Sequence, residues 1–196
     1  MSGQAGGIEA PTLYFTKPGP RNTGDVLQAA ARRCSALSIQ DVLIPTCSGK
    51  TALQAREVLP SEVRVVAVSH VTGFQKADHQ ELDPGTRREL EDRGVPVLTC
   101  QHAFGGVGRA VRNKTSTFQV DEIMAYTLRV FGQGTKVAVE LALMAADAGL
   151  VRTDQDLISA GGTMSGVDTA LVLRPVNSFH FFDLKVREII CKPSGF

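Results

Sequence analysis

The sequence lacks several features that mark common classes of protein. It contains no tryptophan, only 6% aromatic residues, and a formal net charge of +1. Proteins that bind nucleic acid or anionic membranes through their overall charge need a clear excess of Lys and Arg. This chain has no such excess, so we expect neither nucleic acid nor a membrane as a partner. Any anion must instead be held locally, by loops and single basic residues.

The few cysteines form no recognisable motif. None of Cys34, Cys47, Cys100 and Cys191 lies in a C-x-x-C pair, so the pattern indicates neither a zinc ribbon nor a redox motif. Wide spacing in a chain of this size is typical of a reducing compartment. Residues 1–10 lack the basic and apolar segments of a signal peptide, and we expect a flexible tail there. The sequence therefore predicts a cytoplasmic protein.

Long apolar runs are also missing. The most apolar stretch, residues 137–151, is interrupted by Glu140 and Asp147 and is too short to span a bilayer. It predicts either a deeply buried helix or a contact between subunits, and the second alternative would give a homo-oligomer.

The chain has enough apolar residues, 43% of 196, to form one hydrophobic core of good size. Apolar runs alternate with segments of helical periodicity, which is typical of an α/β fold with a mainly parallel sheet. We expect three layers, with helices on both faces and antiparallel strands added at the C-terminal edge, in a single domain over residues 11–196. Strands are expected at 12–16, 41–45, 63–68, 95–100, 156–160, 167–174 and 184–191, and helices at 23–37, 51–59, 84–93, 120–131 and 136–148. Residues 101–117 contain the pair Gly105-Gly106 and several basic residues, and we expect them to be less regular.

The informative loops follow strands. Parallel α/β sheets bind ligands at the carboxyl ends of their strands, so we expect the loops at 17–23, 46–51, 69–74, 102–106 and 161–168 to converge on one edge. Among them, residues 46–51 (the 46–51 loop) join an apolar strand to a helix through small hydroxyl and glycine residues and a lysine. A helix start offers unpaired N–H groups and a partial positive charge, which suits a phosphate.

An NTPase P-loop is excluded at this position. Its pattern places a first glycine where this chain has Ile44, so the wide phosphate cradle of a P-loop cannot form. The simpler alternative is an ordinary capped helix start, which needs only Ser48. The excess of small donor groups favours the phosphate.

The segment Thr46-Cys47-Ser48-Gly49-Lys50-Thr51-Ala52 resembles the loop by which the C-terminal domain of pyruvate kinase binds the phosphate of its sugar-bisphosphate activator. The whole chain resembles stand-alone proteins with that fold, through residues 14–23, 72–74, 140–149, 168–170 and 188–191. Members of this group bind FMN, so the resemblance implies an FMN ligand, whereas spacing alone implies only a phosphate. The catalytic barrel of pyruvate kinase is not part of the resemblance, which therefore implies no kinase activity.

The resemblance and the loop positions together predict a set of ligand-binding residues. We expect them to be Asn22, Thr46, Cys47, Ser48, Gly49, Lys50, Thr51, His70, Thr72, Gly73, Phe74, Gly161, Gly162 and Asp168. Lys50 would strengthen anion binding, and residues 70–74 would line the flavin ring. Plainer roles stay open for several of them: core packing for Phe74 and Cys47, a structural role for His70, and turns for the 161–162 glycines and Asp168.

Other clusters of polar residues are better explained by solvent exposure. Arg109, Arg112 and Lys114 could meet an anionic substrate, but a solvated basic face is the simpler interpretation. Asp78, His79 and Glu81 offer metal-binding atoms without a further partner, so we expect no metal site.

Two functions follow as hypotheses. The first is a cytoplasmic FMN-binding protein, with a flavin-dependent oxidoreductase as one activity that the resemblance leaves open. The second is a non-catalytic regulatory module that binds a sugar phosphate or another nucleotide. No catalytic residue can be assigned from the sequence.

Overall fold

The computed structural model describes residues 7–195. Within them, seven strands form one sheet in the order β1-β7-β6-β5-β2-β3-β4, which confirms the predicted α/β fold. The elements in chain order are β1 (Leu13–Phe15), η1 (Pro20–Asn22), α1 (Thr23–Leu37), β2 (Asp41–Pro45), α2 (Lys50–Val58), β3 (Arg64–Ser69), α3 (Pro84–Asp92), β4 (Val97–Thr99), α4 (Val107–Thr115), α5 (Val120–Arg129), α6 (Gln133–Asp147), β5 (Leu157–Gly161), β6 (Thr169–Arg174), η2 (Ser178–Asp183) and β7 (Lys185–Pro193).

The sheet is mostly parallel, as predicted. Strand β2 pairs in parallel with β3 and β5, β3 with β4, and β1 with β7. Strand β6 is antiparallel to both of its neighbours, β5 and β7, so it alone among the described strands runs against the others. The loops after β1 to β5 therefore meet at one edge, which we call the carboxyl edge.

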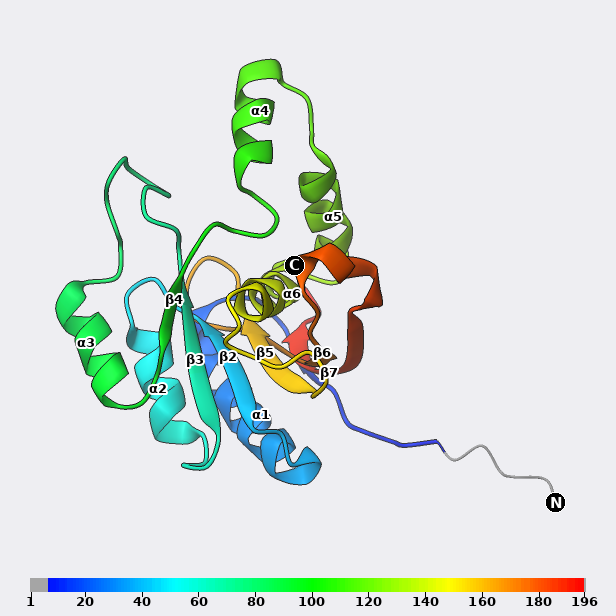
Figure 1. Cartoon of the computed structure of the whole chain (residues 1–196). Coiled ribbons are helices and arrows are strands. Elements are labelled where there is room, and N and C mark those ends of the chain that lie inside the picture. Colours follow the sequence, from blue (N-terminus) through cyan, green and yellow to red (C-terminus); the bar gives the residue numbers. More distant parts are fainter. Residues whose placement is uncertain (1–6, 196) are drawn as a thin grey trace.

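Helices cover both faces of the sheet (Figure 1). Helices α1, α2 and α3 bury one core with Val42 and Ile44 of β2, and α5 and α6 bury a second core with Leu43 of the same strand. Successive side chains of a strand point to opposite faces, so the apolar run of β2 serves both cores. The burial of most of α6 decides between the two alternatives for its apolar sequence in favour of a deep core helix.

The prediction that residues 101–117 are irregular is wrong, because they contain α4. No residue of α4 is buried, so this helix contributes nothing to the core. Its nine residues begin just after Gly105 and Gly106 and include Gly108, and glycines of this kind favour a loop in the sequence. In Figure 1, α4 stands away from the sheet, beyond α5. The short helix η2, between β6 and β7, was not predicted either.

The sequence also predicted a flexible N-terminal tail and no membrane-spanning segment. Residues 1–6 of the predicted tail lie outside the described residues, and residues 7–10 are exposed and have no regular structure. None of the helices within residues 7–195 combines the length and the apolar character needed to cross a bilayer.

Candidate functional site

The 46–51 loop leads from β2 into α2 at the carboxyl edge. The Thr46 N–H donates to the Val68 carbonyl at 2.9 Å, and the Thr46 hydroxyl accepts from the Gly49 N–H at 3.0 Å. Gly49 adopts a left-handed conformation with φ of 86°, and it gives α2 no side-chain cap. Since the first N–H groups of a helix have no partner within it, the first turn of α2 keeps donors available for an anion.

Two neighbouring cavities open beside this loop. Their volumes are about 230 and 260 Å³. They share the lining residues Pro45, Thr46, Cys47, His70, Gln133 and Val137. The second cavity, the loop cavity, also reaches Ser48, Thr51 and Gly162. The first, the helix cavity, extends between β3 and α6 to Lys136 and Glu140.

One wall of the helix cavity carries three rings. The His70 and Phe74 ring centroids lie 4.2 Å apart, and the Phe74 and His102 centroids 5.1 Å apart, with nearly parallel planes. The Arg109 guanidinium lies 5.8 Å from the Phe74 centroid. Burial lowers the pKa of His102, although Glu140 opposes the shift. His102 is therefore a neutral imidazole at neutral pH.

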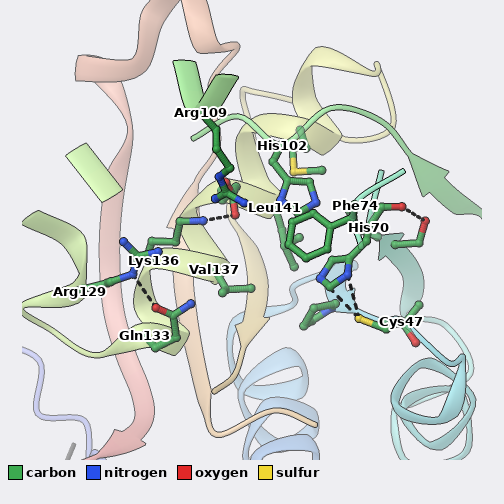
Figure 2. A pocket seen from close by; sticks show the side chains of 16 residues that line it. Cys47, His70, Phe74, His102, Arg109, Arg129, Gln133, Lys136, Val137 and Leu141 are labelled. Atoms are coloured by element: carbon green, nitrogen blue, oxygen red, sulfur yellow. Dashed lines mark hydrogen bonds and ion pairs between the residues drawn. The ribbon is translucent and has the colours of Figure 1, made fainter. Parts of the chain in front are cut away.

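The wall facing these rings is cationic (Figure 2). The Lys136 ammonium lies 2.5 Å from a Glu140 carboxylate oxygen, and the second oxygen of Glu140 accepts from the Phe104 N–H at 3.0 Å. Arg129 donates to the Gln133 side chain at 2.7 Å. The buried Arg109 Nε has no hydrogen-bond partner within residues 7–195. Burial lowers the pKa of Lys136, although its pairing with Glu140 opposes the shift.

Cys47 and His70 lie where the two cavities join. The Cys47 sulfur is 3.5 Å from both ring nitrogens of His70, and His70 Nδ1 is 2.6 Å from a Glu81 carboxylate oxygen. Burial and the charge of Glu81 raise the pKa of the Cys47 thiol. Cys47 is thus a protonated thiol at neutral pH, and not a ready nucleophile.

The structure brings half of the predicted ligand-binding residues to the two cavities. Those that line one or both are Thr46, Cys47, Ser48, Thr51, His70, Phe74 and Gly162. Lys50 is exposed at the start of α2 and lines neither cavity, and Gly49 shapes the turn without lining one. Thr72 and Gly73 are exposed on the loop after β3, where the Thr72 hydroxyl accepts from Gln80 at 3.3 Å.

The remaining predicted residues have structural roles in the described chain. The Asn22 side chain does not cap α1; it donates to the Lys17 carbonyl at 2.9 Å. A Cβ on Gly161 would lie 1.9 Å from the Gly134 carbonyl oxygen, so this glycine permits close packing of β5 on α6.

Asp168 is fully buried. Its carboxylate accepts from the N–H groups of Gly19 and Thr163 and from the hydroxyl of Thr169, at 3.0, 3.2 and 2.9 Å. These bonds favour the alternative in which Asp168 holds the turn together.

Sequence reasoning missed the cationic wall. Arg129, Lys136 and Glu140 were assigned to the expected helices, Gln133 to the break between them, and Arg109 to a solvated face. A usable signal was present: Lys136 and Glu140 lie four residues apart in an otherwise apolar helix, and such charges stay buried only when paired.

Comparison with known proteins identifies the family. The family model described as "Pyruvate kinase, alpha/beta domain" matches residues 24–173. The chain belongs to this family. The matched segment contains every residue that lines the two cavities. The resemblance to the pyruvate kinase C-terminal domain is thereby confirmed at the level of the family.

Solved structures of pyruvate kinases are more distant. A pyruvate kinase from Cryptosporidium parvum is 13% identical, with a TM-score of 0.42, over 81% of this chain and 24% of its own. A Cryptosporidium parvum pyruvate kinase in complex with ADP is also 13% identical, with a TM-score of 0.42, over 82% of this chain and 25% of its own. The chain thus spans about a quarter of the length of these enzymes.

Proposed function

We propose that this member of the pyruvate kinase alpha/beta domain family binds a phosphorylated small molecule, with the phosphate at the 46–51 loop. One observation carries the proposal: the uncapped first turn of α2 opens beside the loop cavity, which Ser48 and Thr51 line. Unpaired N–H groups and the helix dipole favour an anion there. The exposed Lys50 lies at the same turn and adds positive charge.

The ligand that we propose is FMN. Pockets for ligands of this size usually measure about 300–1,000 Å³, so such a ligand would need both cavities, which share six lining residues. With the phosphate in the loop cavity, the flavin ring would extend toward Phe74 and His102, and Arg129 and Lys136 would lie opposite. These residues fit the group, because positive charge near a flavin ring tunes its electronics.

FMN would supply redox chemistry when bound, and an oxidoreductase activity is part of this proposal. The chain's own contribution would be to bind the phosphate at α2, orient the ring against the aromatic wall and place Lys136 near it. The neutral His102 could donate or accept one hydrogen bond at the ring.

The binding test is an FMN titration of the purified chain, followed by flavin absorbance and fluorescence. Ser48→Ala and Lys50→Ala should each weaken FMN binding, since a charge-assisted contact contributes about 1.5–3 kcal/mol. Lys185→Ala, at an exposed position of β7, is the charge-matched control and should bind as the parent does. Unchanged affinity in both loop variants would place the phosphate elsewhere, and a chain that takes up no FMN would refute the flavin assignment.

A second candidate is a regulatory module that binds a sugar bisphosphate without chemistry. The observation that favours it is the cationic wall, because Arg109, Arg129 and Lys136 line the helix cavity and could hold a second anion there. Arg109→Ala should then weaken the binding of a sugar bisphosphate more than the binding of the corresponding monophosphate. Displacement of FMN by the bisphosphate and absence of NAD(P)H oxidation would favour this candidate over the first.

Location and assembly complete the proposal. We infer a cytoplasmic protein and a homo-oligomer, and the exposed Val120, Ile123 and Phe131 on and beside α5 support self-association. Light scattering of the purified chain tests the second point; a monomer at high concentration would contradict it.

A further inference from the structure

Three side chains with metal-binding atoms meet at the carboxyl edge, although they come from separate segments. Cys47 belongs to the 46–51 loop, His70 follows β3, and Glu81 lies in the loop that leads to α3. One ligand atom from each lies within 4.8 Å of the others, and all three residues are half-buried. The sequence did not predict this group, because along the chain Glu81 lies beside Asp78 and His79, and those three residues indicated no metal site.

We propose that Cys47, His70 and Glu81 bind a divalent transition-metal ion, and that zinc is the ion that suits them best. A thiolate, an imidazole and a carboxylate are the three ligand types that zinc uses in proteins. Three protein ligands also leave one tetrahedral position open, as in catalytic zinc sites. This site goes beyond the phosphate-binding proposal and does not depend on it.

The distances suit a tetrahedral ion. With Zn–S of about 2.3 Å and Zn–N of about 2.0–2.1 Å, a tetrahedral angle separates sulfur and nitrogen by about 3.5 Å. The Cys47 sulfur lies 3.5 Å from the His70 nitrogens. The Glu81 oxygen, now hydrogen-bonded to His70 Nδ1 at 2.6 Å, would have to withdraw by about 0.7 Å to reach the tetrahedral spacing of about 3.3 Å. A side-chain torsion supplies a movement of this size.

Neighbouring groups hold the ligands in place. The second carboxylate oxygen of Glu81 accepts from Gln75 Nε2 at 2.6 Å, and Gln80 Nε2 donates to the His70 carbonyl at 3.0 Å. Supporting hydrogen bonds of this kind orient the ligands of metal sites. Cys47 and His70 line both cavities, so the open position would face the space that a ligand occupies.

The same three residues could instead form a nucleophilic triad, but the charge of Glu81 opposes this use. Glu81 disfavours a free thiolate beside it, because like charges repel. A bound cation reverses this effect, since the thiolate and the carboxylate then both contribute to binding.

The test is a Co²⁺ titration of the untagged, chelator-treated full chain. One equivalent should bind with a thiolate-to-cobalt charge-transfer band and the visible bands of tetrahedral cobalt, and Zn²⁺ should displace it. Cys47→Ala should abolish the charge-transfer band. His70→Ala and Glu81→Gln should each weaken binding by at least about tenfold, the lower end for losses around metal sites. Circular dichroism of each variant checks that the fold is kept.

Matched controls remove one imidazole and one carboxylate elsewhere. His180→Ala and Glu57→Gln, both at exposed positions, should bind cobalt as the parent does. Absence of stoichiometric binding by the parent, or an unchanged charge-transfer band in folded Cys47→Ala, would overturn the proposal. Loss of binding in the controls to the same extent as in the ligand variants would overturn it as well.

Discussion

Replacing Gly49 by alanine should destabilise the protein more than the same change at Gly73. Both glycines have left-handed backbones, with φ of 86° and 85°. A Cβ on Gly49 would lie 2.2 Å from Thr86 Cγ2, whereas a Cβ on Gly73 would meet nothing within 4 Å. The two variants therefore share the backbone strain and differ in the clash.

The magnitudes follow from the two effects. A left-handed alanine costs about 1–2 kcal/mol, and this is the whole cost expected for Gly73→Ala. Overpacking adds about 1–3 kcal/mol, so Gly49→Ala should lower the free energy of unfolding by about 2–5 kcal/mol. Gly49→Ala should also weaken the binding of FMN, because the displaced turn carries the N–H groups at the start of α2.

Urea unfolding measures both variants, and Thr86→Ser supplies the decisive background. Serine lacks the Cγ2 atom, so Gly49→Ala in that background should cost only the backbone strain. Equal destabilisation by the two glycine variants would show that Thr86 turns aside freely. A Gly49→Ala penalty that Thr86→Ser leaves unchanged would refute the clash as its cause.

Three further predictions concern ionisable side chains that are buried or half-buried. Lys136→Met should lower the free energy of unfolding by about 3–5 kcal/mol, because it leaves the buried Glu140 without its charged partner. Urea unfolding of Lys136→Met, with and without Glu140→Leu, checks this. The double variant should be more stable than Lys136→Met alone. His102 has a pKa below its usual 6.5, so the unfolded chain takes up this proton first. Stability should therefore fall as the pH drops through about 6.5 toward the folded pKa, and His102→Gln should flatten that loss in chelator-treated samples. Asp168→Asn should destabilise by about 1–3 kcal/mol, since an amide cannot accept from all three donors; the exposed Asp92→Asn should change the melting temperature little.

The fold could be predicted where local pattern and tertiary packing agree. The expected strand over 41–45 coincides with β2, because Val42, Leu43 and Ile44 are buried on both faces of a covered sheet. Helix α4 was missed because it is short and lies in a glycine-rich segment, with Gly105 and Gly106 before it and Gly108 within it. Glycine is a poor helix former, and the helix packs no residue into the core that would mark it as part of the fold.

The site was predictable only in part, for a related reason. The convergence of loops followed from parallel strands, which correctly placed Thr46 and His70 at one edge. Sequence alone did not show that Lys136 and Glu140 face that edge. A helix that is apolar nearly all round is predicted to be buried, but its pattern does not say which way its few polar side chains point. Nor could it pair Glu81 with Cys47, which lies 34 positions earlier in the chain.

The exposed helix α4 has a consequence for how the site could be observed. It buries no residue, yet its Arg109 lines the helix cavity and its Arg112 forms an ion pair with Glu122 of α5 at 2.9 Å. A helix with so little burial should open at small free-energy cost. A ligand that contacts Arg109 stabilises only the arrangement in which α4 places Arg109 at the helix cavity. Linkage then requires that this arrangement of α4 raise the affinity for the ligand by the same factor. Slower amide hydrogen exchange along α4 should therefore report occupancy of the cavity, for a coloured or a colourless ligand alike.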